Sequence, residues 1–384
     1  FSESANQRWG YDDYDTPGNP QDDHICLKSG GNTLIQVDIG GGLTGSDFIF
    51  ECDDSRIVTA PRDTDSFEMR LTANFPTRKT ETTLHARCTC PNAATCSATP
   101  DARSYASINV HVYREKRVEV VVAKIGTNLL HETPAPADYA AHQTAANDKL
   151  KEAVVMYRMS NFNNNNIVRV HYDLDADLHF SYDIANGGGA ELDAIARHMT
   201  GTGTKVRVAI VRQMKSYYYL RRRVNATQTS IPVRASSDEG VFAYPPGSTT
   251  TLGRPGNEEQ VTITGKSGRS YTVTRAAPPN NRRHRRNDPL EFPAAGWGSD
   301  PIVVVQGTLS VNQIKWTIIH EVGHVALGLA DVTDPDNIML YCVAPEPPDG
   351  PLSDYRLRYC SRIRNYTPPG GTENQWETIP RPDI

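Results

Sequence analysis

Short segments of alternating apolar and polar residues dominate the first third of the chain. Between Ile25 and about Val118 they recur roughly every 8 to 12 residues, a spacing typical of antiparallel β-sandwiches. TLIQVDI, EMRLTANF and SINVHVY are examples, and no stretch of helical periodicity interrupts them. The pattern predicts a β-sandwich here and by itself assigns it no chemistry.

From Val118 the apolar runs become longer. The segment VEVVVAKIG (118–126) is almost continuously apolar, as expected for a strand that is buried on both faces. A helix-forming stretch follows at 136–159, then one or two strands within 167–184, a short helix at 191–199 and a strand at 205–214. Alternating strands and helices predict layered α/β or α+β structure.

A second β-rich segment interrupts this alternation. Residues 221–293 contain NATQTSIPV, EEQVTITGKSGRSYTVTRA and NRRHRRNDPLEF, with a predicted turn at Lys266-Ser267-Gly268. The segment resembles small β modules of phage tail and bacterial surface proteins. Because the strand PIVVVQG (301–307) and a helix follow it, we interpret the segment as an insertion.

The predicted architecture is therefore multidomain. Residues 1–117 form an immunoglobulin-like β-sandwich, which is either an accessory module or a propeptide. An α+β domain comprises residues 118–220 and 294–384, and residues 221–293 form a small β domain inserted into it.

Composition excludes few functions. The 384 residues carry 40 Lys and Arg against 45 Asp and Glu, a net charge of -5, so overall charge gives no reason to expect a nucleic-acid partner. The 28 glycines and 26 prolines favour loop-rich β domains over a helical bundle. No apolar run approaches the roughly 20 residues of a membrane-spanning helix. We expect a soluble monomer.

The cysteines favour an exported protein. None of the seven forms the paired C-x-x-C spacing of a structural zinc site, which leaves disulfides as the better interpretation. Cys342 and Cys360 are predicted to pair, since they are the only cysteines in the last 280 or so residues. The pairing of the other five stays open: Cys26, Cys52, Cys88, Cys90 and Cys96.

The strongest chemical motif lies on a predicted helix that begins after Ser310. Apolar residues follow at spacings of three and four: Val311, Ile314, Ile318, Val322, Val325 and Leu329. Another face carries His320, Glu321 and His324 in the order H-E-V-G-H. Two imidazoles one turn apart can bind one metal ion, and the adjacent carboxylate can reach a metal-activated water. The motif predicts a catalytic zinc site.

A third ligand is needed, and the downstream residues supply candidates. His320, Glu321, His324, Gly328, Asp331 and Met339 follow the order of the signature H-E-x-x-H-x-x-G-x-x-H/D plus Met-turn, and here the chain resembles the metzincin zinc endopeptidases. The resemblance implies that Asp331 is the third ligand and that the fold combines a mostly parallel sheet, a backing helix and the active-site helix. It also implies a final helix, for which 352–366 is the candidate.

The chain departs from the metzincin pattern in one spacing. Three residues separate His324 from Gly328 where the family has two, which predicts an adjusted turn near Ala326–Gly328. Asp334, before Pro335, is the alternative third ligand. By resemblance, Met339 forms an apolar floor beneath the metal and Tyr341 is a candidate for stabilising the oxyanion.

Weaker patterns favour ordinary structural roles. Asp173, Asp175 and Asp177 suggest Ca²⁺ but lack the glycine and final glutamate of a calcium loop, so a solvated strand face is the preferred interpretation. The runs 221–223 and 281–286 are rich in arginine and are interpreted as exposed loops, with contact to polyanions as the alternative.

The sequence as a whole predicts a secreted zinc endopeptidase that acts on protein or peptide substrates, with Glu321 as general base. One alternative is a surface or tail-associated binding protein whose metal site is structural or vestigial. Another keeps the zinc but takes the third ligand from a distant glutamate, as in thermolysin-like enzymes.

Overall fold

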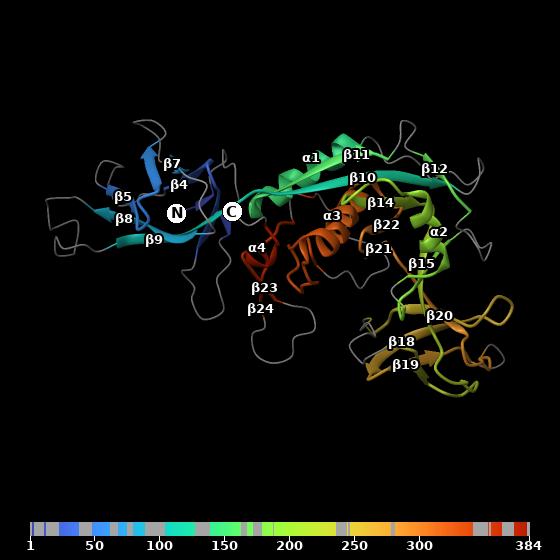
Figure 1. Cartoon of the computed structure of the whole chain (residues 1–384). Coiled ribbons are helices and arrows are strands. Elements are labelled where there is room, and N and C mark those ends of the chain that lie inside the picture. The colour runs from blue at the N-terminus through green and yellow to red at the C-terminus, as the bar shows by residue number, and fades with distance from the viewer. Residues whose placement is uncertain are drawn as a thin grey trace.

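The computed structural model describes residues 2–3, 11–12, 23–37, 48–61, 68–74, 80–88, 104–126, 139–162, 167–171, 179–186, 188–235, 244, 246–277, 281–340, 352, 355–362 and 372–381. Among the described residues strands greatly outnumber helices, and the chain forms a β-rich multidomain protein, as the pattern predicted (Figure 1). No described helix has the length and apolarity needed to cross a membrane.

The N-terminal third contains two sheets. One has the order β1 (Ser2–Glu3), β4 (Asn32–Gln36), β7 (Glu68–Ala73), β6 (Ile57–Pro61), and the other β2 (Tyr11–Asp12), β3 (His24–Lys28), β9 (Ser104–Tyr113), β8 (Thr80–Cys88), β5 (Phe48–Cys52). All neighbours pair antiparallel except β3 and β9. Alternate residues of both sheets enter one apolar core, as the period of two predicts; Leu27, Ile35, Leu71, Leu84 and Val110 are examples.

Strand β9 leads after two residues into β10 (Lys116–Gly126), the long central strand of the next sheet (Figure 1). The sheet order is β11 (Val155–Asn161), β10, β14 (Val206–Val211), β22 (Ile302–Gln306), β21 (Gly296–Ser299). The first four strands are parallel, β21 is an antiparallel edge strand, and β12 (Ile167–Arg169) pairs with the end of β10.

This sheet is covered on both faces. Val208, Ile210, Val303 and Val305 pack in the same core as helices α1 (Tyr139–Leu150) and α3 (Val311–Leu327). The intervening residues of the same strands pack in a second core with α2 (Ala190–His198), for example Ala209 and Val304. Burial on both faces explains why these strands read as continuous apolar runs.

A seven-stranded sheet forms the β-rich segment near the middle of the chain. Its order is β13 (Phe180–Asp183), β15 (Met214–Tyr219), β20 (Pro289–Pro293), β17 (Thr249–Leu252), β18 (Glu259–Ser267), β19 (Ser270–Arg275), β16 (Ser230–Pro232). The predicted β18–β19 hairpin is present. The sheet starts before residue 221, because β15 pairs with both β13 and β20.

The predicted helix at 352–366 is wrong for the residues that are described. Residues 355–359 contain no helix, and β23 (Cys360–Arg362) pairs with β24 (Thr372–Asn374), followed by the single turn α4 (Gln375–Thr378). Backbone groups in this segment are hydrogen-bonded to distant residues and not to each other as in a helix. The Arg356 carbonyl accepts from Ile338 N, and Leu357 N donates to Glu152 Oε2. These elements lie between the N-terminal sheets and α3 (Figure 1).

Candidate metal centre

Helix α3 presents the H-E-V-G-H motif. Ser310 caps its N-terminus in a capping box with Gln313, and the helix buries Ile314, Ile318 and Val322 against the sheet. Val311, expected in the apolar stripe, is instead 48% exposed. The packing fixes the rotation of α3 about its axis, and with it the direction of His320 and His324.

Three ligand atoms from His320, His324 and Asp331 converge. The two Nε2 atoms are 3.1 Å apart, and Asp331 Oδ1 lies 3.3 Å from each. Ligands about 2.0–2.1 Å from a tetrahedral zinc ion are separated from one another by about 3.3–3.4 Å. Within the described residues this is the single His/Cys/Asp/Glu group with a metal-compatible arrangement. The donor set therefore fits zinc in both chemistry and spacing.

Backbone carbonyls orient both imidazoles. His320 Nδ1 lies 3.1 Å from the Ile338 carbonyl, and His324 Nδ1 lies 2.6 Å from the Leu329 carbonyl. A carbonyl can only accept, so each Nδ1 carries a proton, and each Nε2 is left as the nitrogen that can bind a metal ion placed between it and Asp331. Histidine ligands of metals in proteins are commonly held in this way.

The end of α3 absorbs the extra residue between His324 and Gly328. Gly328 is left-handed (φ 67°), and its N–H and that of Leu329 both donate to the Gly323 carbonyl, five and six residues back. An α-helix bonds four residues back, so the last turn is wide. The widened turn lies where the spacing predicted an adjustment, and it brings Asp331 back to the two histidines.

Glu373, from β24, holds this turn from outside. Its two carboxylate oxygens lie 3.3 and 3.4 Å from Ala330 N, next to Asp331. The side chain is buried, which raises the pKa of the Glu373 carboxyl. Glu373 is distant in sequence and is not a member of the His320–His324–Asp331 group. It therefore occupies a supporting position rather than that of a distant third ligand.

Glu321 faces the edge strand β21. Cβ atoms added at Gly296 and Gly298 would lie 2.5 Å from Thr317 Cγ2 and 2.8 Å from Val325 Cγ2, and within 3.3 Å of Glu321 side-chain atoms. The two glycines therefore allow α3 to approach β21 closely at Glu321. The Gly298 N–H donates to it. Burial raises the pKa of Glu321, although the neighbouring histidines act in the opposite direction.

The segment 337–340 forms a tight turn beneath the histidines. Met339 is buried, and a Cβ added to Gly323 would lie 2.7 Å from its Sδ, so the glycine of H-E-V-G-H makes room for the Met339 side chain. Asn337 holds the turn: its Oδ1 accepts from Met339 N, and its Nδ2 donates to Ser361 Oγ and Gln375 Oε1. The turn therefore packs on α3, with the apolar Met339 side chain lying against Gly323.

Charges within the group reinforce one another. Burial disfavours protonation of His324, but its contact with Asp331 and the charges of Glu321 and Asp331 outweigh burial and raise the pKa of His324 to about 9. Burial acts against ionisation of Asp331, yet His320 and His324 hold its pKa well below the usual range. The pocket therefore favours a cation among these three side chains.

The structure places the remaining predicted residues as follows. Asp334, the alternative ligand, is buried with its carbonyl accepting from Asn337 N, and it is not part of the metal group. Tyr341, Cys342 and the triplet Asp173, Asp175 and Asp177 lie outside the described residues. Neither Cys26 nor Cys52 forms a disulfide, the Cys26 thiol donates to the Glu152 carbonyl, and no side chain is described for the other five cysteines.

Sequence patterns missed four contributors: Gly296, Gly298, Asn337 and Glu373. The G-W-G repeat before PIVVVQG carried a weak clue, since paired glycines in a strand indicate close approach of another element. Nothing near Glu373 marked it, because its partner Ala330 is 43 residues away.

Comparisons with known proteins leave the family open. No protein-family model and no curated protein matches the chain. A sialyltransferase from Photobacterium damsela matches at 11% identity and a TM-score of 0.22, over 50% of this chain and 35% of that protein. A likeness at this level carries no information about fold or function.

Proposed function

We propose that the protein is a zinc-dependent endopeptidase whose centre is His320, His324 and Asp331, with Glu321 as general base. The observation that carries the proposal is the convergence of two Nε2 atoms and one carboxylate oxygen at 3.1–3.3 Å, beside a second carboxylate, that of Glu321, which is outside the ligand group. A closed structural zinc site takes four ligands and has no use for such a base. Zinc, when bound, supplies a Lewis acid that acidifies water and polarises a peptide carbonyl.

Glu321 performs the proton transfers. Its raised pKa brings the carboxylate nearer to the operating pH, where a general base is most effective. It takes the proton from the attacking water and then gives it to the leaving amine, so one carboxylate acts first as base and then as acid. The N–H of Gly298 donates to this carboxylate and restrains its orientation.

Strand β21 favours a peptide as substrate. It ends the sheet order, and among the described strands none pairs with its outer edge, while one face of the strand packs on α3 at Glu321. An extended peptide can add to such an edge through backbone hydrogen bonds. The scissile bond of a peptide bound along β21 would lie near Glu321 and the two histidines.

The wider assignment rests on the sequence resemblance. We propose a metzincin-like catalytic domain formed by 118–220 and 294–384, an immunoglobulin-like module at 1–117 and an inserted module at 221–293, whose sheet also includes β15 and β13 from before residue 221. The wide turn before Asp331 and the Met339 floor support the metzincin assignment. Secretion, a monomeric state, an oxyanion role for Tyr341 and the Cys342–Cys360 bond remain predictions.

The decisive experiment compares the chain with Glu321→Gln. We expect both to hold about one zinc, and the variant to lose roughly 10²- to 10⁴-fold in the rate of cleaving an unfolded protein, because it cannot accept the proton. Zinc is measured directly, and a chelator should abolish the wild-type cleavage. Equal turnover in the two proteins would overturn the mechanism. Zinc without any cleavage in the wild type would favour a binding protein.

A further inference from the structure

Two arginine runs that are 60 residues apart in sequence lie side by side in the inserted module. Val224 and His284 form an antiparallel bridge with reciprocal backbone bonds of 2.9 and 3.0 Å. Further along, Leu220 N donates to the Asp288 carbonyl and Asn287 N to the Leu220 carbonyl. These bonds unite the arginine surface, which we define as Arg221, Arg222, Arg223, Arg282, Arg283, Arg285 and Arg286.

Alternation directs these side chains outward. Val224 and His284 are fully buried, and their neighbours Arg223, Arg283 and Arg285 are exposed, as expected when successive residues of extended chain face opposite ways. All seven arginines are exposed. Within the described part of the chain, none forms an ion pair with a carboxylate.

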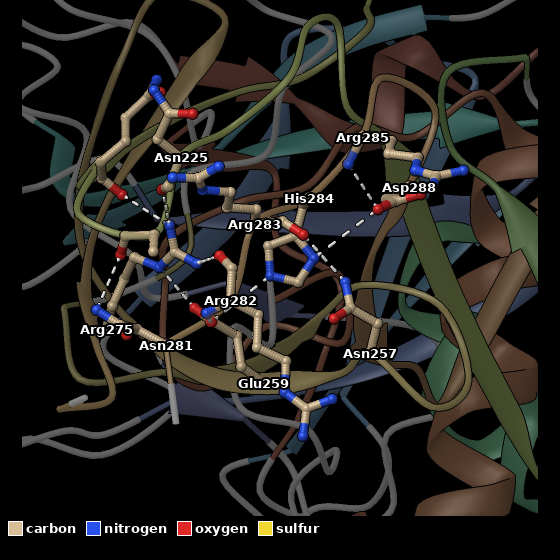
Figure 2. Close-up of polar contacts among 12 residues, drawn as sticks. Asn225, Asn257, Glu259, Arg275, Asn281, Arg282, Arg283, His284, Arg285 and Asp288 are labelled. Atoms are coloured by element: carbon tan, nitrogen blue, oxygen red, sulfur yellow. Dashed lines mark hydrogen bonds and ion pairs between the residues drawn. The ribbon is translucent and has the colours of Figure 1, made fainter. Parts of the chain in front are cut away.

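Buried side chains hold the backbone of the second run in place (Figure 2). Glu259 accepts from Arg282 N, and Asp288 accepts from Arg285 N at 2.7 Å. Arg275, paired with Glu259 at 2.6 Å, donates to the Arg282 carbonyl. Asn257 Nδ2 donates to the Arg283 carbonyl at 3.1 Å.

Polar side chains of the module therefore fix the backbone of the second arginine run, although the arginine side chains of that run are exposed to solvent. A solvated loop does not need such support, whereas a binding surface gains from it, because less conformational freedom is lost on binding. Seven exposed guanidinium groups without a carboxylate partner among the described residues, on an otherwise acidic chain, are suited to an anionic partner.

We propose that the arginine surface binds a sulfated polysaccharide. Guanidinium forks match tetrahedral oxyanions through paired N–H donors, and every cation of the surface is arginine rather than lysine. Neither run contains an exposed aromatic ring on which an unpaired base could stack, and the described part of the module has no helix to enter a DNA groove. The sulfate esters of a polysaccharide need only the charges and the forks.

Binding of the full chain to heparin, to unsulfated hyaluronan and to duplex DNA tests the proposal. The Glu321→Gln background separates binding from any cleavage. We expect heparin to bind most tightly, with affinity that falls as salt rises. The variant Arg222→Ser/Arg283→Ser/Arg286→Ser should weaken heparin binding by about tenfold or more and flatten the salt dependence, because fewer counterions are released.

A matched control removes the same charge elsewhere. Arg70→Ser/Arg158→Ser/Arg169→Ser takes three exposed arginines from outside the module, and we expect it to change heparin affinity by less than about twofold. If both variants weaken heparin binding equally, the loss is explained by the change in net charge alone, and the proposal is overturned. Tighter binding to duplex DNA than to heparin would indicate nucleic acid rather than a polysaccharide as the partner. If no probe binds at low salt, the arginine surface is not a binding site for anionic polymers.

Discussion

Two imidazole nitrogens with lone pairs directed at each other, 3.1 Å apart and beside a carboxylate oxygen, repel unless a cation lies among them. The backbone carbonyls of Ile338 and Leu329 enforce this arrangement by accepting hydrogen bonds from the two Nδ1–H groups. In the metal-free chain a proton on His324 supplies the positive charge, as its raised pKa indicates. The residues thus create a site that exchanges a proton for a metal ion.

The choice between Asp331 and Asp334 is testable by zinc content. Asp331→Ala should lower zinc affinity by more than the about 10- to 100-fold typical of outer-shell partners, because it removes a converging oxygen. Asp334→Ala is the matched control and should retain zinc, since Asp334 is outside the group. Zinc is assayed by direct metal analysis. Retention in Asp331→Ala with loss in Asp334→Ala would exchange the assignments.

Proton release on zinc binding should depend on pH. The pKa of His324 is raised to about 9, so at pH 7 the metal-free side chain is charged and must lose its proton to bind zinc. We expect release of about one proton at pH 7 and much less at about pH 10, measured by calorimetry in buffers of different ionisation enthalpy. Without metal, the stability from this charge is full below the unfolded pKa of about 6.5 and is lost as pH rises through 9. Zinc uptake at pH 7 without proton release would contradict the coupling.

At the scale of elements, α3 is fixed at both ends by local chemistry. Ser310 and Gln313 satisfy backbone donors at its start, and left-handed Gly328 ends it in a wide turn. In between, Gly323 admits Met339, and the glycines of β21 admit Glu321. Small residues on the neighbouring elements thus decide how closely the helix approaches its surroundings.

Removing the cap of α3 should cost measurable stability. Ser310→Ala takes away the hydroxyl that accepts from Gln313 N, and we expect the free energy of unfolding to fall by about 1 kcal/mol. Chemical denaturation measures it. Thr308→Ala, an exposed hydroxyl two residues earlier, is the control and should change stability by less than about 0.5 kcal/mol. Equal effects would show that the capping box is energetically unimportant.

At the scale of the whole molecule, three sheets are joined by continuous chain and shared contacts. Strand β9 runs on into β10, and Tyr113 at the end of β9 donates to Glu377 Oε1 at 2.6 Å. Arg381 stacks over the Tyr113 ring and donates to the Ala153 carbonyl. The C-terminal segment therefore ties the N-terminal sheets to the central sheet.

The pairing of β15 with β20 predicts where the inserted module can be removed. Deleting 214–293 takes both strands, whose ends are adjacent because Ala294 N donates to the Met214 carbonyl. With a short Gly-Ser bridge, we expect a soluble chain that binds zinc. Deleting only 221–293 leaves β15 without β20 and uncovers Tyr218, so we expect aggregation. Size-exclusion chromatography and zinc analysis distinguish them, and the reverse ranking would place β15 in the central domain.

The sequence alone determined the features that depend on local periodicity and spacing. Alternation predicted the N-terminal strands, continuous apolar runs predicted strands buried on both faces, and H-E-V-G-H placed two imidazoles on one helix face, because 3.6 residues per turn fixes that geometry. The tertiary structure decided what depends on distant partners. Glu373 reaches Ala330 across 43 residues, β15 pairs with β20 from the far end of the inserted segment, and residues 355–359 give their backbone groups to distant segments instead of a helix. These features depend on contacts between residues that are far apart in the sequence. The local pattern of apolar and polar residues does not specify such contacts.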